Sequence, residues 1–426
     1  MLTQTFNHFV VCLLLPSLLL GDDKFVALDY TGDLQQQHTS IVEVLSSTTA
    51  SKKKLTFAVV DRDQTTRLFL QNNYVVGATF IPPNEVDDDD FTDELAFSAW
   101  TLQVSALYST CLAFYDAAKE LANPTRAAVV VPCRKPLQAL ILGGGAGSVA
   151  MYLDRRNVTV DVVELHPEMI ELAERHGGLI LQNGGRIIKG DALFILQRGR
   201  KGMREDNYDI VIQDLFDGAN SLALLESENL LGVLLTDWLT PDGTLVVNMI
   251  GSAVQGNPAY PITEYTFHVL RTKFHHVRCY RDVPLDLHPY RMGNIACYAT
   301  NNPRGVLFTI PDTVARAPRD EFPTSWHIRT FPKWVVFQAD EGIELEVEEC
   351  VIVEHLGVCL HSAPRRVSAP HFRTVHPLKR EVLLTAQKGI AEMMKVHTLE
   401  LLGNDADNVL SEIESLSRRG GIHDTV

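Results

Sequence analysis

The chain has 426 residues, of which 46% are hydrophobic, enough to bury the cores of two or three domains. It carries 53 Asp and Glu against 38 Lys and Arg, a net charge of −15 that argues against a nucleic-acid surface, because phosphate binding needs clustered cations. Such a charge attracts basic partners, for example a polyamine or a lysine-rich protein segment, or serves only solubility. The 7 cysteines include no CxxC pair, so we expect reduced, buried thiols rather than a disulfide framework or a zinc site.

The first 22 residues form a hydrophobic N-terminal segment. Its apolar part, residues 9–20, has the length of a signal-peptide core and is too short for a membrane-spanning helix. No Lys or Arg precedes it, and Leu19 and Gly21 would make a poor cleavage site. We therefore expect a buried start of the next domain, no membrane span and a cytoplasmic protein. The alternative is the secretory pathway, with residues 1–21 as a signal peptide.

Residues 23–92 are predicted to form a small antiparallel β domain. Short runs rich in Val, Phe, Tyr and Thr are separated by turn-forming residues, and they lie at residues 25–30, 40–47, 54–61, 66–71 and 74–80. A helical pattern then begins at Asp93 and continues to Asn123, where Pro124 ends it.

The most informative stretch runs from Leu137 to Glu164. An apolar run at residues 139–142 predicts a strand buried on both faces, and the chain then turns into a helix through Gly143, Gly144, Gly145 and Gly147. Glycine lets the backbone bend sharply and approach a ligand closely, and the helix that follows points free amides at that ligand. A second buried strand, residues 158–163, ends in Glu164, whose carboxylate suits the two hydroxyls of a ribose. This order predicts a nucleoside-cofactor site, for either a dinucleotide or S-adenosylmethionine.

Two further acids follow predicted strands. A strand at residues 186–190 leads to Asp191, which is placed to accept a hydrogen bond from an adenine amino group. A fourth strand, residues 208–213, ends in Asp214. These acids have no evident task in a NAD-dependent oxidoreductase, so S-adenosylmethionine is favoured. The predicted cofactor set is Gly143, Gly145, Gly147, Glu164, Leu165, Asp191, Ala192 and Asp214.

Four strands that end in GGGAG, E, GDA and QD resemble the class I S-adenosylmethionine fold, and more narrowly the spermidine synthase superfamily, which places a small β domain in front. The resemblance implies that Asp214 is catalytic, because it would bind and deprotonate the attacking amine. This chain departs from the family's pattern at Ala146, where an aminopropyl-binding acid is expected. It also departs at Phe97 and Ser98, which stand where a catalytic tyrosine and a glutamine are expected.

A branch without those groups is the set of methyltransferases resembling the carboxy-terminal half of the elongation factor 1-alpha lysine and N-terminal methyltransferase. The chain is similar to it over residues 14–310, in LLPSLLLGDD, in the glycine loop and in GNIACYATNNP. In the superfamily the helix at residues 93–123 closes one wall of the active site, so Phe97, Trp100 and Gln103 are candidates to line a substrate pocket. Packing is the favoured role for Trp100.

The predicted Rossmann-like domain spans residues 93–310. A helix through Leu239 leads to a turn at residues 240–243 and a fifth strand at residues 244–249. A helix at residues 262–274 and a hairpin of strands at residues 277–280 and 294–299 complete a seven-stranded sheet.

Residues 311–426 form a C-terminal extension to which the sequence assigns no role. Strands are expected within residues 335–362, and two amphipathic helices at residues 378–402 and 408–419 predict packing against the core or a dimer contact. No metal is expected. The pattern of two histidines four residues apart beside an acid is not formed by His275, His276, His371 and His376.

The sequence therefore predicts an α/β protein in which a small antiparallel β domain precedes a Rossmann-like seven-stranded transferase domain. The favoured function is methyl transfer from S-adenosylmethionine to an amine, on a protein lysine or N-terminus, since an activated sulfonium mainly needs alignment. The first alternative is aminopropyl transfer from decarboxylated S-adenosylmethionine in polyamine biosynthesis. The second is a catalytically silent cofactor-binding scaffold.

Overall fold

The computed structural model describes residues 39–48, 54–62, 66–81, 98–113, 136–200, 202–216, 225, 228–252, 256–281, 292–303, 305–306, 333–338, 344–349, 351–353, 358–360 and 377–419. Every described residue belongs to one compact unit, residues 37–426. Several predicted features lie outside the described residues: the segment 1–22, the strand at 25–30, Phe97, and both His371 and His376.

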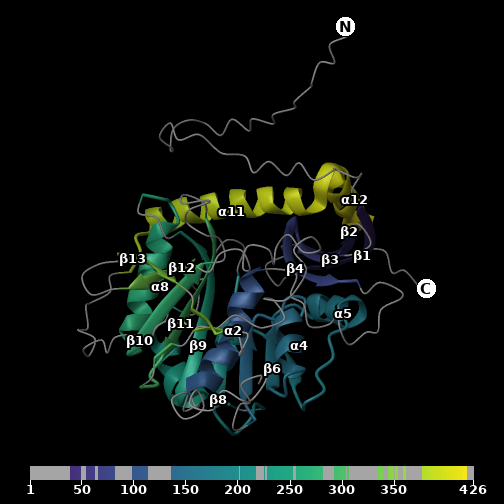
Figure 1. The fold of residues 1–426 in the computed structure, drawn as a ribbon. Coiled ribbons are helices and arrows are strands. Elements are labelled where there is room, and N and C mark those ends of the chain that lie inside the picture. The colour runs from purple at the N-terminus through teal and green to yellow at the C-terminus, as the bar shows by residue number, and fades with distance from the viewer. Residues whose placement is uncertain are drawn as a thin grey trace. The chain divides into compact units, whose positions relative to one another are not determined.

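A seven-stranded mixed sheet holds the predicted Rossmann-like core (Figure 1). Its strand order is β10-β11-β9-β8-β5-β6-β7, with parallel pairing from β9 to β7 and antiparallel pairing of β11 with both β9 and β10. The strands are β5 (Gln138–Leu142), β6 (Thr159–Glu164), β7 (Arg186–Lys189), β8 (Tyr208–Gln213), β9 (Leu239–Gly251), β10 (His276–Arg281) and β11 (Gly293–Thr300). The α/β class and the predicted hairpin at the sheet edge are both confirmed.

The central strand β5 shows why this segment forms a strand with two buried faces. Successive side chains of a strand point to opposite sides of the sheet. Accordingly, Ala139 and Ile141 pack in one hydrophobic cluster, whereas Leu140 and Leu142 pack in another. Burying a leucine contributes roughly 1.5–3 kcal/mol. The apolar run therefore holds helices against both faces of the sheet and fixes the position of the glycine loop that follows it.

Helices connect the strands and cover the sheet. They are α2 (Ser98–Ala113), α4 (Ser148–Asp154), α5 (Pro167–His176), α6 (Ala192–Arg198), α7 (Glu228–Val233) and α8 (Tyr260–Arg271). Helix α2 contacts β8, β9 and β11, in front of which it lies in Figure 1. Every described side chain of α2 is buried, including polar ones such as Gln103. A helix enclosed in this way shows no amphipathic stripe, so its polar side chains must find partners inside the protein.

A separate antiparallel sheet has the strand order β1-β2-β3-β4 and confirms the predicted antiparallel strands at the N-terminal side. Its strands are β1 (Thr39–Thr48), β2 (Lys54–Arg62), β3 (Thr66–Gln71) and β4 (Tyr74–Phe80). One face of this sheet packs against Ala146 of the glycine loop and against Met169 and Leu172 of α5. An ion pair between buried Glu43 and Arg175 adds a polar link between β1 and α5. The small sheet thus supports the glycine loop directly.

The C-terminal extension packs back onto both sheets. Helix α11 (Arg380–Leu402) contacts α8 and β4, and α12 (Ala406–Arg419), which follows a 3-10 turn at Gly403–Asp405, contacts β1 (Figure 1). Side chains at Ala386 and Ile390 join the main core, which supports the packing alternative for the amphipathic stripe. The extension also contains two strand pairs, β12 (Lys333–Gln338) with β13 (Glu344–Glu349) and β14 (Val351–Val353) with β15 (Val358–Leu360).

Two predicted boundaries differ from the structure. The helix before β9 ends as a π-helix at Leu234–Trp238, and β9 already begins at Leu239. The predicted turn at residues 240–243 lies inside β9, where the register with β8 shifts between Tyr208 and Ile210. The turn-forming residues 240–243 therefore form a bulge within the strand, because β9 pairs with β8 on both sides of them.

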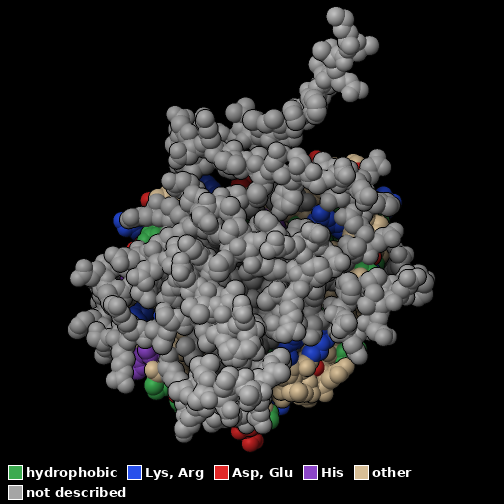
Figure 2. Space-filling view, in the orientation of Figure 1, with side chains coloured by type: hydrophobic (Ala, Val, Ile, Leu, Met, Phe, Trp, Pro, Cys, Tyr) green, Lys and Arg blue, Asp and Glu red, His purple; other side chains and the backbone are tan. Residues whose placement is uncertain are grey.

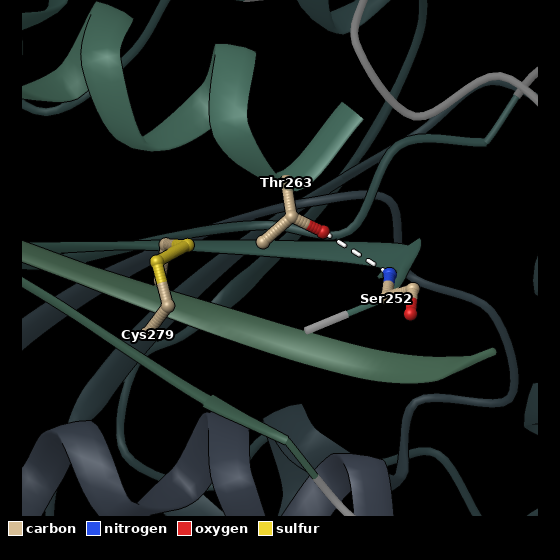
Figure 3. The surroundings of a disulfide bond; sticks show 4 residues. Ser252, Thr263 and Cys279 are labelled. Carbon is tan, nitrogen blue, oxygen red and sulfur yellow. Dashed lines mark hydrogen bonds between the residues drawn. A yellow bond between two sulfur atoms is a disulfide. The ribbon is translucent and has the colours of Figure 1, made fainter. Parts of the chain in front are cut away.

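One cysteine pair contradicts the expectation of reduced thiols. Cys279 of β10 and Cys297 of β11 form a disulfide, with their Cα atoms 3.9 Å apart (Figure 3). The two residues lie directly opposite each other in the antiparallel register. Eighteen residues separate them in the chain, so only the pairing of the two strands brings their side chains together. Beside this pair, Ser252 N donates a hydrogen bond to Thr263 Oγ1 at 3.2 Å, which ties the end of β9 to α8.

Candidate active site

The glycine loop between β5 and α4 adopts backbone conformations that favour glycine. Gly143 has a φ of 95° and Gly147 has a φ of 80°. At Gly143 the constraint is also spatial, because a Cβ there would lie 2.2 Å from the carbonyl oxygen of Asp214. The amide of Asp214 donates to the carbonyl oxygen of Leu142 at 2.8 Å, which fixes the end of β8 beside the loop. The loop and Asp214 are therefore parts of one tightly packed structure.

Glu164 lies beneath the loop and is 8% exposed. Its Oε2 accepts hydrogen bonds from the amides of Gly144 at 2.8 Å and Gly145 at 3.2 Å, and its Oε1 accepts one from the amide of His166 at 2.9 Å. An ionised carboxylate has about four acceptor positions, so a ribose hydroxyl would use the capacity that remains. The acid at the tip of β6 thus holds the loop in shape, a role that the sequence did not reveal.

Asp191 has a local role at the start of α6. Its Oδ1 accepts hydrogen bonds from the amides of Leu193 at 2.8 Å and Phe194 at 3.3 Å, the geometry of a helix N-cap. Asp191 is exposed, Ala192 is buried, and the neighbouring large apolar side chains Leu165 and Phe194 are 55% and 51% exposed. The sequence-based set included Leu165 but missed Phe194. An apolar residue in so short a helix gives no sign of function in the sequence.

Asp214 lies at the end of β8 and is held by two side-chain amides. Its Oδ1 accepts from Asn248 Nδ2 at 2.7 Å, and its Oδ2 accepts from Gln103 Nε2 at 3.0 Å. Burial raises the pKa of the Asp214 carboxyl; both amide hydrogen bonds oppose this shift, and the charge of Glu164 adds to it. A carboxylate with a raised pKa accepts a proton more readily than an ordinary aspartate.

A small pocket joins the loop to Asp214. It borders about 280 Å³ of space outside protein atoms, part of which is open solvent, and its described lining residues are Val76, Trp100, Gln103, Ile141, Gly143, Gly144, Gly145, Ala146, Gly147, Ser148, Val149 and Asp214. Four members of the predicted set, the three glycines and Asp214, come together here. The other four, Glu164, Leu165, Asp191 and Ala192, are not among its described lining residues. The pocket is therefore the glycine-loop and Asp214 part of the predicted site.

Of the two residues that contact Asp214, sequence reasoning singled out one and missed the other. Gln103 and Trp100 line the pocket beside the glycine loop, and their part in a substrate pocket stays a prediction. Asn248 was not singled out, although a polar residue within the apolar run of β9 is the signal that could have found it. Phe97 lies outside the described residues, and the side chain of Ser98 does as well.

The described surface adds little to this site. Figure 2 shows described Lys and Arg side chains at separate places around the margin of one face, interspersed with other residue types. Within the described residues, no group of three His, Cys, Asp or Glu side chains could hold a metal ion. In the same part of the chain, no helix is both long and apolar enough to cross a membrane.

Known proteins resemble only parts of this chain. No protein-family model matches the chain. A stretch of 86 residues, 20% of this chain, is 33% identical to the polyamine aminopropyltransferase of Vibrio vulnificus (strain CMCP6) and spans 28% of that protein's length. The chain therefore matches less than a third of this curated relative.

Two solved structures show the same likeness at low identity. A probable spermidine synthase from Corynebacterium glutamicum ATCC 13032 has a TM-score of 0.44 and 19% identity, over 58% of this chain and 77% of that one. Human methyltransferase-like protein 13 has a TM-score of 0.35 and 17% identity, over 53% of this chain and 90% of that one. Likeness at this level assigns no activity to this chain, and the narrower resemblance to the elongation factor methyltransferase branch stays a prediction.

Proposed function

We propose that this protein is an S-adenosylmethionine-dependent transferase that modifies an amine. The observation that carries the proposal is the pocket that the glycine loop and Asp214 line together. A sulfonium donor and an ammonium acceptor are both cations, and Glu164 and Asp214 place two acids at this site. Solved structures with this kind of fold are described in complex with SAH or SAM, which supports the same donor here.

The proposed cofactor contacts follow the elements of the site. Gly143, Gly145 and Gly147 would face the methionine end of the donor, since all three line the pocket. Glu164 would receive a ribose hydroxyl. The adenine would lie toward Leu165, Asp191 and Ala192; the exposed side chains of Leu165 and Asp191 support this, because an adenine ring needs an apolar surface and a hydrogen-bond acceptor.

Asp214 would prepare the acceptor. An amine enters as an ammonium ion, and the carboxylate accepts one of its protons, which frees the nitrogen lone pair. The sulfonium supplies an activated carbon, so the new N–C bond forms as the C–S bond breaks and the electron pair stays on sulfur. Asp214 then returns its proton to solvent when the product amine leaves. The raised pKa of Asp214 suits this proton exchange.

Methyl transfer is favoured over aminopropyl transfer by the surroundings of Ala146. This side chain is 3% exposed, and a Cβ built on Gly77 of β4 would lie only 2.5 Å from its Cβ. The small sheet therefore packs directly on the position where the resemblance implies an aminopropyl-binding acid. The second candidate, aminopropyl transfer to a polyamine, is favoured by the name of the Vibrio vulnificus relative.

The compartment and the oligomeric state are also proposals. The cytoplasmic location stays a prediction, since residues 1–22 lie outside the described part of the chain. The Cys279–Cys297 disulfide favours the secretory alternative, because such bonds persist in oxidising compartments. A thiol count on protein from its native cell, together with mass spectrometry of its N-terminus, would decide between the two. A homodimer is testable by light scattering.

The function is tested first by calorimetric binding of S-adenosylmethionine, its decarboxylated form and NAD. We expect the sulfonium donors to bind and NAD to fail, and Glu164→Ala to weaken binding, whereas Glu174→Ala on the exposed side of α5 should not. Transfer is then read by mass spectrometry with a lysine peptide and putrescine as acceptors. Methylated peptide supports the favoured reaction, and spermidine supports the second candidate. Donor binding without any transfer would leave the scaffold alternative, and binding of NAD alone would refute the proposal.

A further inference from the structure

The two amides that contact Asp214 have no role in the reaction described above. Gln103 comes from α2 and Asn248 from β9, and they are 0% and 3% exposed. Each donates one N–H to a different oxygen of the same carboxylate. Three elements far apart in the chain therefore converge on one side chain at the wall of the pocket.

The other half of each amide makes this convergence costly. Among the described residues, neither Gln103 Oε1 nor Asn248 Oδ1 has a hydrogen-bond partner. A buried amide oxygen without a partner destabilises the fold, so packing alone would favour an apolar side chain at both positions. The polar contact that the structure describes for each side chain is its hydrogen bond to Asp214, so we look for the value of each amide in what it does to that carboxylate.

We propose that Gln103 and Asn248 are positioning residues that hold the Asp214 carboxylate ionised and oriented toward the acceptor amine. The inference rests on the proposed function and extends it. Two of the roughly four acceptor positions of the carboxylate are filled by the amides, which leaves the others for N–H groups of an ammonium ion. Because both partners are neutral, the negative charge is kept uncancelled and attracts a cationic acceptor.

The electrostatic balance at Asp214 agrees with this role. Burial and the Glu164 charge from β6 raise the pKa of Asp214, whereas the donors from α2 and β9 lower it. Loss of either donor should therefore raise this pKa further. An enzyme that needs the ionised carboxylate would then lose activity at a higher pH than before.

The test measures kcat/KM against pH for Gln103→Met and Asn248→Leu, with whichever acceptor the wild type uses, the lysine peptide or putrescine. Loss of a hydrogen bond to a charged group should move the acid limb, which is the fall of kcat/KM at low pH, upward by about one to two pH units. The acceptor's own ionisation is common to all variants and cancels in the comparison. Donor affinity, measured by calorimetry, should stay within about twofold of wild type.

Thr110→Val is the matched control. Its hydroxyl donates to Thr244 Oγ1 at 3.0 Å and thus links the same two elements, α2 and β9, without contact to Asp214. We expect it to leave the position of the acid limb unchanged. The Asp214→Asn background is a second control, because Gln103→Met should cost about tenfold in kcat/KM with the aspartate present and less than about twofold without it. If Gln103→Met does not fold, Asn248→Leu makes the same test at the other oxygen.

The outcomes separate the two proposals. A shifted acid limb in the amide variants alone supports the positioning role. Amide variants that behave like Thr110→Val, or that cost equally in the Asp214→Asn background, overturn the positioning role and leave the proposed function intact. A wild-type protein that transfers nothing to either acceptor, or an Asp214→Asn variant with wild-type activity, overturns the role of Asp214 and the positioning role together.

Discussion

Replacing Gly143 by alanine tests whether the glycine loop and the end of β8 form one packed structure. The φ of 95° costs an alanine roughly 1–2 kcal/mol. The new Cβ would also lie 2.2 Å from the Asp214 carbonyl oxygen and 2.8 Å from its carbonyl carbon, an overlap with backbone that adds roughly 1–3 kcal/mol. We therefore expect the free energy of unfolding to fall by roughly 2–5 kcal/mol.

Gly178→Ala provides the matched control for this substitution. Gly178 also has a positive φ, 66°, but nothing lies within 4 Å of a Cβ placed there. The free energy of unfolding of Gly178→Ala should therefore fall only by the conformational cost of roughly 1–2 kcal/mol. Urea unfolding of both variants measures the difference, and calorimetry with S-adenosylmethionine should show weaker binding for Gly143→Ala alone. Equal losses of stability and unchanged donor binding in the two variants would refute the packing argument.

Three further predictions concern the pocket and its supports. Glu164→Gln removes the charge that raises the pKa of Asp214, so the acid limb of kcat/KM should move to lower pH; an unmoved limb would contradict the coupling, and Glu174→Gln is the control. Ala146→Asp buries an unpaired carboxylate against Gly77 and should lower the free energy of unfolding by roughly 2–4 kcal/mol without creating aminopropyl transfer. Stability equal to that of Ala146→Ser would show that the site has room for an acid. Thr398→Val removes a hydroxyl that accepts from the amide of Val75 at 3.1 Å and should cost about 1 kcal/mol in urea unfolding, whereas Thr385→Val, whose hydroxyl bonds within α11, should cost less.

The elements of the Rossmann-like core were predictable because their signals are local. The run at residues 139–142, the glycines after it and the acids at the ends of the next three strands are contiguous patterns, and β5, β6, β7 and β8 each lie within one residue of the predicted range. Boundaries failed where a neighbouring strand decided the outcome. Residues 240–243 have the composition of a turn, yet pairing of β9 with β8 on both sides absorbs them into a strand.

The candidate site divides in the same way. Gly143, Gly145, Gly147 and Asp214 were identified from the sequence and line one pocket, because a strand, its turn and its terminal acid are close in the chain. The partners of Asp214 could not be assigned, since Gln103 and Asn248 lie 111 and 34 residues away from it. The role of Glu164 as acceptor for the loop amides depends on the conformation of that loop, which no residue pattern specifies.

By itself, the sequence determined the α/β class, the order in which strands, glycine loop and helices follow one another, and the acidic residues that stand at the strand ends. Only the tertiary structure decided which distant groups meet: the amides of α2 and β9 at Asp214, Gly77 against Ala146, Cys279 opposite Cys297, and α11 and α12 against the small sheet. The physical reason is that hydrophobic periodicity and turn chemistry act between near neighbours in the chain. Contacts between distant segments instead depend on register and packing, which are set once the whole core is assembled.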